Sequence, residues 1–110
     1  MEEALERVGG DEELFEEIAG VFIDEGPREL SNIERALEAG DAAALGKLAH
    51  SLKTSVGSFA ATRAYEQAFA LEQAGQSGDL EAAGTIVKTL VVEVNGLLKD
   101  LHAHLGDRPS

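Results

Sequence analysis

The chain has 110 residues, of which 44% are hydrophobic, and its 21 acidic and 9 basic side chains give a formal net charge of −12. This length suits a single domain with a modest core, and the absence of cysteine excludes disulfides, thiolate metal sites and cysteine nucleophiles. The acidity argues against nucleic acid and anionic membrane surfaces as partners, because both need a basic footprint on the protein.

We expect one domain over residues 1–110, with a core at about 11–105, a lead-in at 1–10 and a tail at 106–110. The N-terminus is acidic where a secretory signal would be basic. No apolar run reaches the ~20 residues that span a bilayer. The sequence therefore predicts a soluble, cytoplasmic protein without membrane insertion.

Apolar residues at helical spacing predict a first helix over residues 11–25, with Asp11 suited to the N-cap position. Gly26 and Pro27 follow directly. Glycine ends helices and proline is favoured at the first position of a new one. We therefore expect a break here and a second helix over residues 27–39.

A third helix is predicted from an N-cap at Asp41 to about Gly57, and a fourth over about 61–75. Gly75 and Gly78 are interpreted as turn glycines.

The last helix, over residues 79–105, has the clearest apolar pattern, with steps that alternate between three and four. No strand pattern appears anywhere. Five helices with short connections predict an all-α fold, namely an antiparallel four-helix bundle with the helix at 11–25 as an additional N-terminal helix.

The third helix carries His50, the only histidine away from the C-terminal end. Its apolar stripe consists of Leu45, Leu48, Ala49, Leu52, Val56 and Phe59. At about 100° per residue, His50 lies roughly 140° from the centre of that stripe, so its imidazole should face water.

An exposed imidazole is a nucleophile near neutral pH, because its unperturbed pKa is ~6.5. Lys53 lies one turn further on the same side and could balance the charge of a phosphoryl group on His50. The other neighbours are small, polar or cationic: Gly46, Lys47, Thr54 and Gly57. The two glycines would let another protein approach, although Gly57 could equally just end the helix.

Other chemistries fit less well. Ser51 points about 100° away from His50, which does not suit a Ser/His/Asp hydrolase. His102 and His104 fall on different helix faces, so we expect two solvated histidines and no metal site. There is no glycine-rich phosphate loop with its lysine.

The segment at 49–61 reads AHSLKTSVGSFAA. It resembles the signature of histidine-containing phosphotransfer (HPt) domains, roughly A-H-x-L-K-G-x-x-G-x-[LIVF]-G-A. The positions that match in register are His50, Leu52, Lys53, Gly57 and Phe59. The resemblance extends over residues 10–105, but Thr54 and Ala60 stand where the family usually has glycine.

The resemblance implies a phosphoryl carrier rather than an enzyme. In such domains the histidine is phosphorylated on Nε2 by a receiver aspartate or a kinase, and then passes the phosphoryl group to a receiver aspartate. Lys53 would support the phosphoryl group and Glu72 would lie near His50. The receiver-facing surface would comprise Gly46, Lys47, Thr54, Gly57 and Glu72.

The implied partners are a response-regulator receiver domain and a sensor or hybrid histidine kinase. The receiver would bring the Mg²⁺, so no cofactor is expected on this chain. One exposed histidine per bundle suits a monomer.

Two alternatives stay open. Residues 50–54 are also similar to the H-E-x-[RK]-T-P motif of sensor-kinase phosphoacceptor hairpins, although Ser51 and Ser55 miss its acidic and proline positions. The chain could instead be a helical docking module in which His50 is never phosphorylated.

Overall fold

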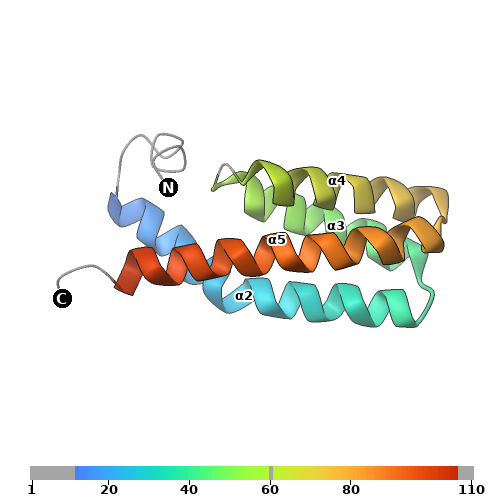
Figure 1. Ribbon diagram of the computed structural model, residues 1–110, viewed down its shortest axis with the longest axis horizontal. Helices are drawn as coiled ribbons and strands as arrows, with labels where there is room; N and C mark the ends of the chain where they lie inside the picture. The colour runs from blue at the N-terminus through green and yellow to red at the C-terminus, as the bar shows by residue number, and fades with distance from the viewer. Residues whose placement is uncertain (1–11, 60, 107–110) are drawn as a thin grey trace.

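The structure is a computed structural model that describes residues 12–59 and 61–106. The helices in these ranges are α2 (Glu12–Glu38), α3 (Ala42–Gly57), α4 (Thr62–Ser77) and α5 (Leu80–Gly106), and no strand occurs among them. Successive helices run antiparallel, and α5 packs back against α2 to close a four-helix bundle (Figure 1). The predicted all-α bundle is confirmed. The predicted lead-in at 1–10, the N-cap at Asp11 and the end of the tail at 107–110 lie outside the described residues.

The predicted break at Gly26 and Pro27 is wrong, because α2 continues through Pro27. The predicted additional N-terminal helix is the first part of α2, and the axis of α2 changes direction along its length (Figure 1). Proline inside a helix removes one backbone hydrogen bond and costs ~3 kcal/mol. Burial of an aromatic side chain stabilises the folded state by ~1.5–3 kcal/mol, and both Phe15 and Phe22 are buried in the first part of α2. Their packing therefore outweighs the local preference to stop.

Aspartates precede α3 and α5 and cap their first turns, as predicted for Asp41. Asp41 Oδ1 accepts a hydrogen bond from the Ala44 N–H at 3.0 Å, and Asp79 Oδ1 accepts one from the Ala82 N–H at 3.0 Å. Each carboxylate thus satisfies an N–H that has no partner within the first helical turn. Gly40 and Gly78 adopt φ of 69° and 75°, a conformation that residues with a Cβ rarely adopt.

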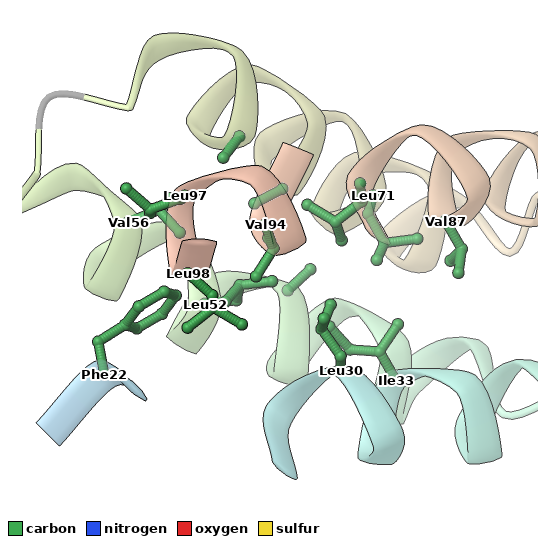
Figure 2. Packing of buried hydrophobic residues seen from close by; sticks show 14 of the residues in the cluster. Phe22, Leu30, Ile33, Leu52, Val56, Leu71, Val87, Val94, Leu97 and Leu98 are labelled. Carbon is green, nitrogen blue, oxygen red and sulfur yellow. The ribbon is translucent and has the colours of Figure 1, made fainter. Parts of the chain in front are cut away.

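The core runs the length of the bundle, and side chains from all four helices meet in it (Figure 2). No polar or charged side chain is buried among the described residues. The predicted stripe of α3 is buried except for the half-buried Leu48. Leu14 and Val21 belong to the apolar residues at helical spacing in the first part of α2, but both are exposed. The core therefore uses a narrower face of α2 than its sequence suggests.

Gly75 is not a turn glycine, because α4 continues past it to Ser77. It is buried where the backbones of α3 and α4 lie in close contact. A Cβ at this position would lie 2.5 Å from the Gly46 backbone nitrogen and 2.8 Å from the Ala42 carbonyl oxygen. Only glycine allows the two backbones to approach this closely.

Gly75→Ala should therefore destabilise the bundle. Alanine has the better helix propensity, by ~1 kcal/mol. A clash with backbone atoms forces the helices apart, however, and we expect a net loss of ~1–3 kcal/mol in the free energy of unfolding. Urea denaturation measures this change.

Gly96→Ala is the matched control, because a Cβ at Gly96 would meet no atom within 4 Å. This variant should gain up to ~1 kcal/mol. If the two variants shifted the urea midpoint equally, the close contact at Gly75 would be contradicted.

Candidate functional site

His50 lies in the middle of α3, on the side that faces away from the core. Its neighbours Ala49 and Leu52 are fully buried, whereas its own side chain is 63% exposed. The predicted exposure of His50 is confirmed. The histidine thus lies on a helix whose opposite face is anchored in the core, while its ring stays accessible to another protein.

Glu72 reaches across from α4 to the histidine. Its Oε2 lies 2.7 Å from His50 Nδ1. A carboxylate only accepts hydrogen bonds, so the Nδ1 atom carries the hydrogen of this pair. In the neutral ring the lone pair is then on Nε2. Glu72 therefore selects the tautomer whose free nitrogen can act as a nucleophile.

The second oxygen of Glu72 binds Lys53. Lys53 Nζ donates a hydrogen bond to Glu72 Oε1 at 2.8 Å, and the two side chains are only 16% and 13% exposed. One carboxylate thus holds both the histidine and the lysine. The prediction that Glu72 lies near His50 agrees with this geometry, and the structure adds that Glu72 also pairs with Lys53.

The pKa of Glu72 is lowered from its ordinary value. The hydrogen bond from Lys53 is the largest cause, burial opposes it, and the hydrogen bond with His50 adds to the lowering. A depressed carboxyl pKa means that the interaction is present at neutral pH and is lost as the pH falls through the lowered value. Glu72 is therefore ionised under ordinary conditions.

Phe69, which the sequence pattern did not indicate as a site residue, completes the surroundings of Lys53. The ammonium Nζ lies 5.1 Å from the centroid of the Phe69 ring. Phe69 comes three residues before Glu72 and so shares its face of α4. That spacing was the available signal, but it becomes informative only once Glu72 is known to face His50.

Thr54 lies one turn after His50 and is exposed. Its hydroxyl donates to the His50 carbonyl oxygen at 3.2 Å. Thr54 borders a groove of about 610 Å³ that α2 and α3 form. It also borders a depression of about 600 Å³ beside Tyr65. The threonine therefore lies between these two hollows, one helical turn from the histidine.

The remaining predicted site residues also lie along α3. Lys47 is exposed and lines an open depression of about 750 Å³ that includes His50 and Glu72. Gly46 also lines it and is buried. A Cβ at Gly46 would lie 3.7 Å from the Glu72 carbonyl oxygen, and one at Gly57 would lie 3.6 Å from the Tyr65 ring. Both glycines thus face α4, where a Cβ would make only ordinary contacts, and their contact with a partner stays a prediction.

The described residues offer no group of three or more His, Asp or Glu side chains that could hold a metal ion. His102 is exposed as predicted, whereas His104 is half-buried. The ring of His104 stands edge-on to Phe15, with 5.2 Å between the centroids. No helix in the described part of the chain is both long and apolar enough to cross a membrane.

Comparison with known proteins agrees with this geometry. A family model for the Hpt domain matches residues 17–107, which is most of the chain and includes His50, Lys53 and Glu72. No curated protein and no solved structure matches. This chain therefore belongs to the Hpt family, whose members are histidine phosphotransfer carriers of two-component phosphorelays.

Proposed function

We propose that this chain is a phosphorelay intermediate that accepts a phosphoryl group on His50 Nε2 and exchanges it with the aspartate of a response-regulator receiver domain. The observation that carries the proposal is the 2.7 Å contact between Glu72 Oε2 and His50 Nδ1. This contact leaves the lone pair on the nitrogen that faces solvent.

In the forward step, Nε2 attacks the phosphorus of the receiver's aspartyl phosphate. The Nε2–P bond forms, the P–O bond to the aspartate breaks, and the aspartate leaves as a carboxylate. The ring keeps its Nδ1 hydrogen and becomes positively charged. Glu72, already hydrogen-bonded to that nitrogen, stabilises the charge in the same way that a carboxylate orients and stabilises a catalytic imidazolium.

Lys53 supplies the positive charge that stabilises the phosphoryl group. A phosphoryl group adds nearly two negative charges at neutral pH, and an ammonium within reach stabilises it. The lysine is a mobile point charge on a flexible stem, so it can follow a group that arrives and leaves. His50, Lys53 and Glu72 together lower the barrier in both directions, as a reversible carrier requires.

In this mechanism the receiver supplies the Mg²⁺ and most of the catalytic groups. This chain is then a carrier without its own cofactor, present as a cytoplasmic monomer, and a sensor or hybrid histidine kinase stands upstream. The side chains proposed to face the receiver are Lys47, Thr54 and Glu72, with Gly46 and Gly57 at the edges of that surface.

The direct test is transfer from a phosphorylated receiver domain. The wild-type chain should become labelled, and His50→Gln should not, because the amide has no nucleophilic nitrogen. The folded state should be unaffected, since His50 is exposed. Incubation with ATP alone should label neither protein. Equal labelling of the glutamine variant would overturn the assignment of His50, and failure of every receiver to label the wild type would favour a docking module.

Glu72→Gln tests the role of the carboxylate, because it keeps the size of the side chain and removes its charge. A hydrogen bond to a charged group contributes ~1.5–3 kcal/mol, so we expect transfer to slow by about 10-fold or more. Rapid-quench kinetics measures the rate. In Glu72→Ala, ¹⁵N NMR should also show that His50 no longer prefers the Nδ1–H tautomer. Unchanged rates together with an unchanged tautomer would refute this role.

Thr54→Gly tests whether the bulk of Thr54 selects the partner. Removal of this exposed side chain one turn from His50 should speed transfer and admit a broader set of receivers. Thr54→Val keeps the bulk without the hydroxyl and should behave like the wild type. Rates are compared across a panel of receiver domains. If all three proteins showed the same rates and the same preference among receivers, a role of Thr54 in partner selection would be contradicted.

A further inference from the structure

Phe69 is a large apolar side chain that the core does not use. It lies on α4 and is 42% exposed, outside the cluster of buried residues. Its ring instead contacts a charge, with Lys53 Nζ at 5.1 Å from the centroid. This distance is within the range in which the negative face of an aromatic ring attracts a cation. The contact therefore links Phe69 to the phosphotransfer site rather than to the core.

Lys53 is unusually well enclosed for a lysine, with 16% of its side chain exposed. Two groups hold its ammonium, the Glu72 carboxylate at 2.8 Å and the Phe69 ring. Both belong to α4, while Lys53 itself belongs to α3. A lysine has a long flexible stem, so it is α4 that determines where its charge lies.

The two groups have different effects on the ammonium. The carboxylate accepts a hydrogen bond and competes directly with a phosphoryl oxygen for the lysine. The ring attracts the cation through its quadrupole and takes up no strong acceptor position. When a phosphoryl group arrives, Lys53 can exchange its partner from Glu72 to a phosphoryl oxygen while the ring still keeps it beside His50.

We propose that Phe69 is a positioning residue for phosphotransfer, and that it acts by keeping the Lys53 ammonium at the site as the phosphoryl group enters and leaves. The inference rests on the proposed function of His50. Phe69 does not need to contact the partner protein for this role.

The test compares Phe69→Leu, which removes the aromatic face, with Phe69→Tyr, which retains it. Because a cation–π contact at a partly exposed site is a small stabilisation, Phe69→Leu should slow transfer between His50 and a receiver by about 2- to 5-fold. Phe69→Tyr should transfer at the wild-type rate. Unfolding curves should be nearly the same for all three proteins, since the side chain lies outside the core.

A Lys53→Ala background separates positioning from partner contact. If Phe69 acts through Lys53, Phe69→Leu should cause no further slowing once the lysine is absent. Tyr65→Leu is the matched control, because Tyr65 is equally exposed at 42% but lies over Gly57 instead of under Lys53. Any effect of Tyr65→Leu should persist in the Lys53→Ala background.

NMR of the Lys53 side chain gives a reading that does not depend on transfer. Its ε-methylene protons should lose the ring-current shift in Phe69→Leu and keep it in Phe69→Tyr. Loading with potassium phosphoramidate bypasses the receiver: the Nε2–P bond forms, the P–N bond of the donor breaks and ammonia leaves. A wild-type protein that loads in this way but not from any receiver would contradict the proposed function, and the loading rates would still test Phe69.

The proposal is overturned if Phe69→Leu loads and transfers at the wild-type rate, or if it slows transfer equally with and without Lys53. It is supported if the slowing disappears in the Lys53→Ala background and Phe69→Tyr restores the rate.

Discussion

The close contact between α3 and α4 determines the geometry of the whole site. At Gly75 the backbones approach so closely that a Cβ would clash with the Gly46 nitrogen. Because the helices are antiparallel, each turn forward along α3 meets the preceding turn of α4. One turn from the glycine contact, His50 meets Glu72, and one turn further, Lys53 meets Phe69. The separation of α3 and α4 at the Gly75 contact thus determines whether the Glu72 carboxylate can reach the His50 imidazole.

The side chains of the candidate site come from two helices. In the proposed mechanism, α3 carries the groups that change their bonds during phosphotransfer, namely His50 as the nucleophile and Lys53 as the cation. Their contacts come from α4, through Glu72 and Phe69. The core beneath holds no buried polar or charged residue among those described. The polar contacts of the candidate site therefore lie at the surface of the bundle, between α3 and α4.

Part of the fold followed directly from the sequence, and part did not. Asp41 and Asp79 mark helix starts because a short carboxylate caps free N–H groups wherever the chain enters a helix. Pro27 was misleading, because its local preference to begin a helix was overcome by the burial of Phe15 and Phe22 on the preceding turns. Gly75 was also misread, since a glycine near the end of a helix pattern does not reveal which backbone lies against it.

The sequence by itself determined the all-helical fold and the exposure of His50, and through the family signature it led to His50 as the proposed nucleophile with Lys53 beside it. These depend on residue type and on spacing along one helix, which periodicity records. Only the tertiary structure decided that one carboxylate bridges His50 and Lys53, that Phe69 lies beneath the ammonium and that α2 continues through its proline. The physical reason is that these features depend on the register and distance between helices, and such quantities arise from the packing of side chains far apart in the sequence.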